Sequence, residues 1–192
     1  MQYSIILAVL VALSCIGFYM GRSRAYATAG GRQGLRQLHS LPSYYGFFVA
    51  IWAGVPALLV FFVWVSLQGQ IIEGLVISNL PEAIQNLPTS RLNLVLNDIR
   101  NTVQGDIVSG TQAEVTRQGA EYYRLYASYS RILMIALVAI VALGGFFLAY
   151  RRINPHMRAR NNVERLIMIF MIFCSTLAII TTVGIVLSLL FE

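Results

Sequence analysis

Four long stretches of the chain carry no charged residue and no histidine, and they constrain the fold more than any other feature. They cover residues 3–21, 44–67, 132–150 and 166–191. A membrane-spanning helix needs about 20 mostly apolar residues to cross a hydrocarbon core of about 30 Å. We therefore expect an all-α, polytopic membrane protein with four transmembrane helices.

The composition excludes two other classes of protein. Hydrophobic residues make up 57% of the chain and charged residues only 11%, whereas about 25% of the residues of a soluble domain are charged. A disordered chain would need low hydrophobicity and high charge. The net charge of +6 comes from arginines beside the apolar runs, so we interpret it as a topology signal and expect membrane lipid, not nucleic acid, as a partner.

The charges of the three loops indicate the orientation in the membrane. Residues 22–43 hold four arginines and no acid, residues 68–130 hold six acids and four arginines, and residues 151–165 hold five arginines and one acid. The loops therefore carry +4, −2 and +4. Short basic loops stay in the cytoplasm, so we expect an extracytoplasmic N-terminus. No basic residue precedes the first run, which favours an uncleaved anchor over a signal peptide.

The long loop, residues 68–130, is predicted to form an extracytoplasmic helical hairpin. Pro81 suits the first position of a helix, with Ser78 or Asn79 as its cap. Thr89 or Ser90 would cap the next helix, and Gly105 would end it. That helix carries an apolar stripe at helical spacing. The stripe consists of Leu92, Val95, Leu96, Ile99 and Val103.

A third helix is predicted to run unbroken over residues 112–152. Thr111 and Glu114 form a capping box at its start, and Asn154-Pro155 would stop it. We expect the stripe to pack on its side that bears Val115, Tyr122, Tyr126 and Tyr129. Together with Tyr123, the three tyrosines could instead form a docking surface for an outer protein, although an interfacial aromatic belt explains them as well.

Small residues within the spans predict close helix contacts. Ala50 and Gly54 in the second span, and Gly145 and Ala149 in the third, have the small-x-x-x-small spacing. Pro56 is expected to kink the second span. The only cysteines, Cys15 and Cys174, lie inside apolar runs and are predicted to be buried apolar core residues.

A search for chemistry in the sequence finds no catalytic, cofactor-binding or metal-binding residues to propose. No hydrolase, zinc-protease or dinucleotide motif occurs. His39 and His156 lie in separate loops without a nearby acid or cysteine, so we interpret them as surface residues. The basic loop with Gly30, Gly31 and Gly34 has no phosphate-loop motif and is expected to be irregular. We predict a protein that is not an enzyme and needs no cofactor.

Two segments resemble a known family. The first holds Arg24-Ala25, Ala29-Gly30-Gly31, Leu38-His39-Ser40-Leu41-Pro42, Tyr44-Tyr45-Gly46, Trp52 and Pro56. The second covers residues 158–165 and runs into the last span and residues 185–192. Both resemble the N-terminal part of the extended form of PstC, the permease subunit of the phosphate ATP-binding cassette (ABC) transporter.

The resemblance implies a division of the chain and a set of partners. Residues 1–157 would be an added N-terminal membrane extension, and residues 158–192 the first transmembrane helix of a permease domain. Asn161 and Glu164 would cap that helix. The family implies the bacterial inner membrane, a second permease subunit, a cytoplasmic ATPase and a periplasmic phosphate-binding protein.

The length limits what this chain is expected to do alone. It stops after one permease helix, which points to a fragment, a truncated reading frame or a split subunit that is not transport-competent by itself. Two alternatives are a sensory or regulatory membrane module, in which a ligand would shift the hairpin, and a small membrane assembly factor. An open reading frame beyond codon 192 that encodes five more spans would favour the permease.

Overall fold

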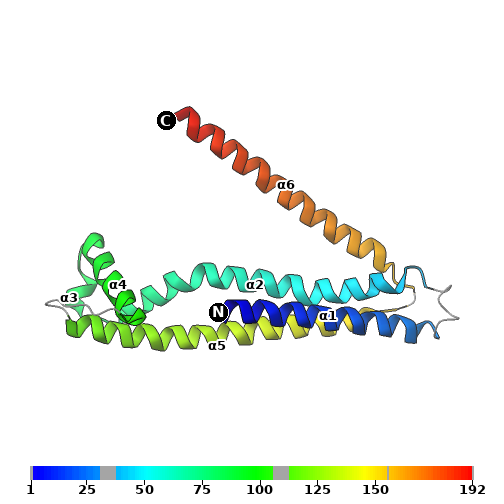
Figure 1. Cartoon of the computed structure of the whole chain (residues 1–192), viewed down its shortest axis with the longest axis horizontal. Helices are drawn as coiled ribbons and strands as arrows, with labels where there is room; N and C mark the ends of the chain where they lie inside the picture. The colour runs from blue at the N-terminus through cyan, green and yellow to red at the C-terminus, as the bar shows by residue number, and fades with distance from the viewer. Residues whose placement is uncertain (1, 31–37, 106–112, 155, 192) are drawn as a thin grey trace. The chain divides into compact units, whose positions relative to one another are not determined.

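The computed structural model describes residues 2–30, 38–105, 113–154 and 156–191 (Figure 1). The helices in these residues are α1 (Gln2–Thr28), α2 (Pro42–Ser78), α3 (Glu82–Gln85), α4 (Thr89–Gln104), α5 (Ala113–Arg152) and α6 (Ala159–Phe191). These residues contain no strand. The all-α prediction is therefore confirmed.

The four longest helices, α1, α2, α5 and α6, are long and apolar enough to cross a membrane. The chain is a multi-pass membrane protein. Each helix extends beyond its predicted apolar run; α1, for example, continues past Arg22 and Arg24 to Thr28. Helical hydrogen bonding continues where no breaker interrupts it, and long arginine side chains can reach the membrane surface from within a span.

The first basic loop is shorter than predicted. Since α1 runs to Thr28 and α2 begins at Pro42, the prediction that residues 22–43 are irregular is wrong at both ends. Gly30 has a φ of 75°, a conformation that only glycine adopts readily. Gly31 and Gly34 lie outside the described residues.

The chain divides into two compact units. The first comprises Met1–Pro56 and Ala142–Glu192, and the second Ala57–Val141. Both α2 and α5 contribute to each unit. This division follows contacts, so it differs from the predicted boundary at residue 157, which follows family resemblance and stays a prediction. Pro56, where a kink is predicted, lies inside α2 and is the last residue of the segment Met1–Pro56 of the first unit.

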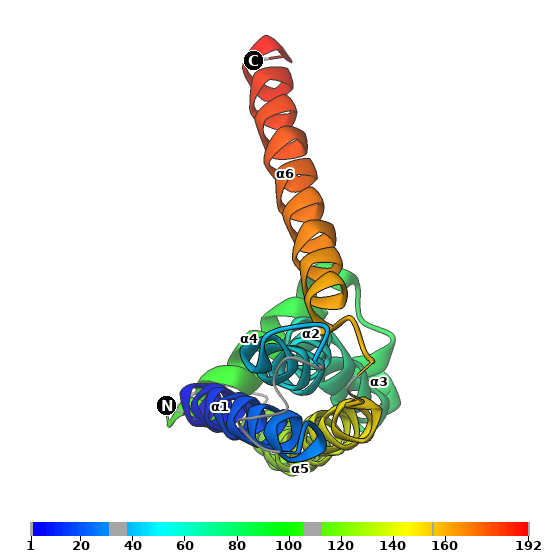
Figure 2. The same cartoon turned by 90° about the vertical axis from the view of Figure 1, so that its right-hand side faces the viewer.

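In the first unit, α1 lies beside α2 and α5, as both views show (Figures 1 and 2). The helices approach closely where side chains are smallest. A Cβ added at Gly21 would lie 2.8 Å from the carbonyl oxygen of Tyr45, and one at Gly145 would overlap the carbonyl oxygen of Trp52. The predicted contact at Gly145 is therefore confirmed. At Gly54 the neighbour is Ser14 of α1, with its Oγ 2.6 Å from an added Cβ.

The second unit contains the predicted hairpin, which we define as α4 together with residues 113–130 of α5. Ile99 of α4 is fully buried. It packs so closely on α5 that a Cβ added at Gly119 would lie 2.5 Å from its Cδ1. The hairpin core also takes in residues from α2 and α3. Its buried members are Ile72, Val76, Leu80, Ile84, Val95, Ile99 and Ala120.

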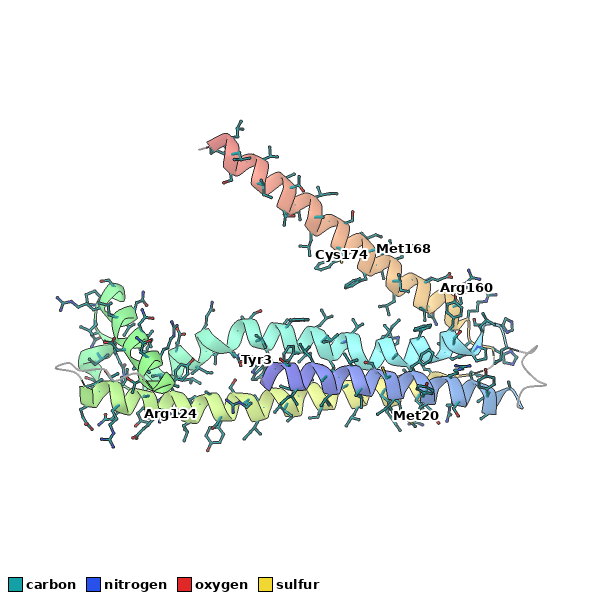
Figure 3. The ribbon with its side chains drawn as sticks, in the orientation of Figure 1. Tyr3, Met20, Arg124, Arg160, Met168 and Cys174 are labelled. Carbon is teal, nitrogen blue, oxygen red and sulfur yellow. The ribbon has the colours of Figure 1, made fainter. Side chains whose placement is uncertain are left out.

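Polar contacts add to this apolar packing. Arg124 of α5, labelled in Figure 3, donates to the carbonyl oxygens of Thr102 and Val103 at 3.3 and 3.5 Å. These carbonyls belong to the last turn of α4, where a cation also complements the helix dipole. Arg100 of α4 forms an ion pair with Glu73 of α2. The contacts tie both α2 and α5 to α4.

The prediction of which side of α5 packs in the hairpin is partly wrong. Tyr123, not Tyr122, packs on the core beside Val115 and Tyr126. Tyr122 and Tyr129 are exposed. The stripe on α4 is placed as predicted: Leu92 and Val103 pack on this core, and Val95, Leu96 and Ile99 are buried. Helical spacing in the sequence therefore predicts the buried side of α4 correctly, but it does not predict which tyrosines of α5 pack against the core.

Several predicted helix starts are also wrong. Pro81 precedes α3 rather than opening it. Helix α4 begins at Thr89, so Thr89 and Ser90 lie inside it and do not cap it, and within the described residues neither helix has a side-chain cap. Ser78 and Asn79 instead donate back to the carbonyl oxygen of Leu75 in α2, at 2.9 and 2.8 Å. The predicted end at Gly105 is confirmed, because this residue has a φ of 104° and its N–H binds the carbonyls of the last turn. Thr111 lies outside the described residues.

The prediction that Cys15 and Cys174 are core residues is wrong. Both are free and exposed, and Cys174 lies on α6 (Figure 3). Every side chain of α6 from residue 167 to 191 is exposed. Lipid is as apolar as a protein core, so an apolar run in a membrane protein does not imply burial by protein.

Candidate functional site

The two segments that carry the family resemblance meet at one end of the first unit. We call residues 38–46 and 157–165 the basic junction. The backbone N–H of Arg160 donates to Ser40 Oγ at 3.2 Å, and the Tyr45 hydroxyl donates to the carbonyl oxygen of Met157 at 2.9 Å. Arg160 marks the start of α6 in Figure 3. Both contacts join the start of α2 to the start of α6.

An apolar core supports these hydrogen bonds. Tyr45 is fully buried although it carries a hydroxyl group, and its hydrogen bond offsets the cost of burying that group. Helices α1, α2, α5 and α6 all contribute to the core. Its buried members are Ala25, Tyr45, Phe48, Val49, Ala149, Ile153, Ala159 and Val163. The first turn and a half of α6 is therefore fixed by packing as well as by hydrogen bonding.

A cation lies against the aromatic side of this core. The Arg24 guanidinium is 4.4 Å from the centre of the Tyr150 ring, close enough for a cation–π interaction. Tyr150 stacks on Phe146, with ring centres 5.7 Å apart. The Nε atom of Arg24 is buried and has no hydrogen-bond partner among the described residues. The guanidinium of Arg24 in α1 thus contacts the Tyr150 ring of α5.

The start of α6 differs from the predicted cap. The helix begins at Ala159, so Asn161 lies in its first turn, and the prediction that Asn161 and Glu164 cap it is wrong. Glu164 instead pairs with Arg160, at 2.5 Å between Oε1 and Nε. The hydroxyl of Ser40 accepts one of the first free N–H groups of α6. A cap from a distant segment replaces the local one.

The two histidines, which the sequence places in separate loops, lie together at this junction. The ring centres of His39 and His156 are 6.0 Å apart in an edge-on arrangement, and both side chains are exposed. Within residues 2–30, 38–105, 113–154 and 156–191, no three His, Cys, Asp or Glu side chains gather as metal ligands do. The pair forms a contact between the two basic loops.

Chemically, the basic junction offers cations and hydrogen-bond donors to an anion. In the part of the chain that the structure describes, the carboxylate at the junction is Glu164, and Arg160 already pairs with it. Arginine is well suited to bind phosphate groups through its planar fork of donors. The junction is therefore suited to hold helices together and to face anionic groups.

Comparison with known proteins gives the family. Residues 7–181 match the profile of a family described as Phosphate ATP-binding cassette transporter. The chain belongs to this family. No curated protein and no solved structure matches it significantly.

The family match includes both segments of the basic junction and most of α1, α2, α5 and α6. A phosphate ABC transporter works with several components, so family membership implies partner proteins in general. The absence of catalytic, cofactor and metal residues, and of enzymatic activity, stays a prediction.

Sequence reasoning missed the roles of Ser40 and Tyr45. Ser40 lies just ahead of Pro42, the first residue of α2, and its position suggests a cap for that helix rather than for α6. The close contact at Gly21 does have a sequence signal, because Gly17 and Gly21 have the same small-x-x-x-small spacing as the pairs in the second and third spans.

Proposed function

We propose that this chain is the N-terminal membrane region of the permease subunit of an ABC-type importer of inorganic phosphate. The match to a phosphate transporter family over residues 7–181 carries the proposal. In this proposal α6 is the first helix of the permease domain, and residues 1–157 form a membrane extension in front of it. The chain acts as a structural part of a transporter and not as an enzyme.

The proposal includes an orientation in the bacterial inner membrane. The basic junction faces the cytoplasm, while the N-terminus and the hairpin are extracytoplasmic. The loop charges of +4, −2 and +4 support this arrangement. The single Asp or Glu of the two basic loops, Glu164, pairs with Arg160.

The contacts at the basic junction support a mechanical role. Moving the start of α6 away from α2 would break the bonds from Tyr45 to Met157 and from Arg160 to Ser40. It would also expose Ala159 and Val163, which are buried. A movement of the first permease helix would therefore be passed to α2, and through the core to α1 and α5.

In this proposal transport depends on other proteins. The partners are a second permease subunit, a cytoplasmic ATPase and a periplasmic phosphate-binding protein. The chain reconstituted alone in liposomes is expected to take up no phosphate. The surface of α6, exposed from residue 167 to 191, is available for lipid and for the other permease helices.

Affinity purification from phosphate-limited cells tests this assignment. A tag on the N-terminus should recover an ABC ATPase and a second permease subunit from mild detergent, identified by mass spectrometry. A tagged, unrelated four-span protein from the same membrane is the control. Recovery of a sensor kinase without any ABC component would contradict the proposal and favour the regulatory alternative.

A further inference from the structure

A cavity of about 340 Å³ opens beside the basic junction, between α2, α5 and the start of α6. Its volume lies within the range of about 300–1,000 Å³ that is typical of small-molecule sites. The lining is amphipathic. It consists of Phe48, Trp52, Arg152, Met157, Asn162, Arg165, Leu166 and Ile169.

The polar groups of this cavity suit a phosphate group. Arg152 is the last residue of α5, and Arg165 lies in the second turn of α6. Among the described residues, neither guanidinium forms an ion pair with a carboxylate. Two arginines and an amide in one cavity can bind the oxygens of a phosphate group through several charge-assisted hydrogen bonds.

The apolar groups decide which kind of phosphate fits. Trp52 lies ten residues into α2 and Ile169 ten residues into α6, so both lie about 15 Å along their helices from the basic end. In a membrane crossed by these helices, both side chains would lie deeper in the hydrocarbon than Arg152, the last residue of α5. A hydrated inorganic phosphate ion would gain nothing from them, whereas a phospholipid would place its acyl chains there.

We propose that this cavity binds the headgroup of an anionic phospholipid, with Arg152 and Arg165 on its phosphate and Trp52 and Ile169 along its acyl chains. The lipid fills the space between α2 and α6 just beyond the contacts of the basic junction. Basic pockets between transmembrane helices are known to select anionic lipids. The proposal does not depend on phosphate import, because it needs only the membrane location and the cavity.

Lipid binding to the purified full-length chain tests the site. Native mass spectrometry should show one phosphatidylglycerol retained more strongly than phosphatidylcholine. Arg152→Gln combined with Arg165→Gln should weaken phosphatidylglycerol binding by about tenfold to thirtyfold. The matched control, Arg22→Gln with Arg151→Gln, removes the same charge from the same end of the helices outside the cavity. It should weaken binding by less than about threefold.

A second variant separates the cavity from surface charge. Ile169→Trp keeps every arginine and fills space where an acyl chain would lie, so it should also weaken phosphatidylglycerol binding. Circular dichroism checks that each variant remains helical. If the arginine pair fails to fold, Ile169→Trp decides: unchanged lipid binding in that variant overturns the proposal.

Three other results would overturn it. Equal losses in the two arginine pairs would mean that only surface charge attracts the lipid. Equal retention of phosphatidylcholine and phosphatidylglycerol would mean that the cavity does not recognise an anion. Displacement of the lipid by inorganic phosphate, but not by sulfate, would identify a site for free phosphate instead.

Discussion

At the scale of single residues, Tyr45 has the most demanding environment in the basic junction. Its ring is fully buried among α1, α2, α5 and α6, and its hydroxyl binds the carbonyl oxygen of Met157. Met157 lies in the connection just before α6. A side chain of α2 therefore holds the connection from which α6 begins.

Replacing Tyr45 with phenylalanine should loosen the start of α6. Tyr45→Phe keeps the ring but removes the hydroxyl, which should lower the free energy of unfolding by about 1–3 kcal/mol. Hydrogen exchange in detergent should become faster at residues 159–163. Tyr44→Phe, at a neighbouring half-buried residue, is the control. Equal effects of the two variants would show that the Met157 contact is unimportant.

The residue scale also shows where sequence reasoning reaches its limit. The sequence can indicate a small residue such as Gly145, because small-x-x-x-small spacing is local. It cannot indicate that Ser40 accepts from Arg160, because the two are 120 positions apart. A cap from a distant segment leaves no spacing pattern, and the local pattern of Asn161 and Glu164 pointed to the wrong cap.

At the scale of helices, the approach of α5 to α2 depends on Gly145. A Cβ there would overlap the Trp52 carbonyl oxygen, whereas one at Gly144 would have no atom of the described residues within 4 Å. Gly145→Val should therefore lower the free energy of unfolding by about 1–3 kcal/mol through overpacking. Gly144→Val changes helix propensity equally but should have little effect on packing. Thermal unfolding in detergent compares them, and equal midpoints would contradict the contact.

The hairpin allows a similar comparison on α4. Ile99 is fully buried against α5, and Leu94 on the same helix is 63% exposed. Ile99→Ala should destabilise the hairpin by about 2–4 kcal/mol because it leaves a cavity. Leu94→Ala should change stability little. Limited proteolysis of residues 89–104 reports the difference, and similar cleavage rates would show that α4 is not held by Ile99.

Helix positions were easier to predict than helix ends. The apolar runs identified all four candidate spans, since hydrophobic length is a property of a continuous segment. The ends depend on what lies beside them: α1 runs past Arg22 and Arg24 to Thr28, and Pro81 precedes α3 instead of opening it. The side of α5 that faces α4 also depends on packing, which selects Tyr123 over Tyr122.

At the scale of the whole molecule, the proposed topology follows from the alternating loop charges. Reporter fusions after Gly34 and after His156 should report the cytoplasm, and a fusion at Gly110 should report the outer side. The reason is the net charge of +4, −2 and +4 in successive loops. Phosphatase and fluorescent-protein fusions at each site give opposite readouts. A cytoplasmic signal at Gly110 would reverse the arrangement.

The central claim is that this chain is part of a phosphate importer, and uptake of radioactive phosphate tests it most directly. An in-frame chromosomal deletion of the codons for residues 1–192 should abolish high-affinity phosphate uptake and leave sulfate uptake unchanged. The wild-type sequence and Gly144→Val should restore uptake, while Gly145→Val should restore less. Phosphate uptake that is the same with and without the chain would contradict the claim.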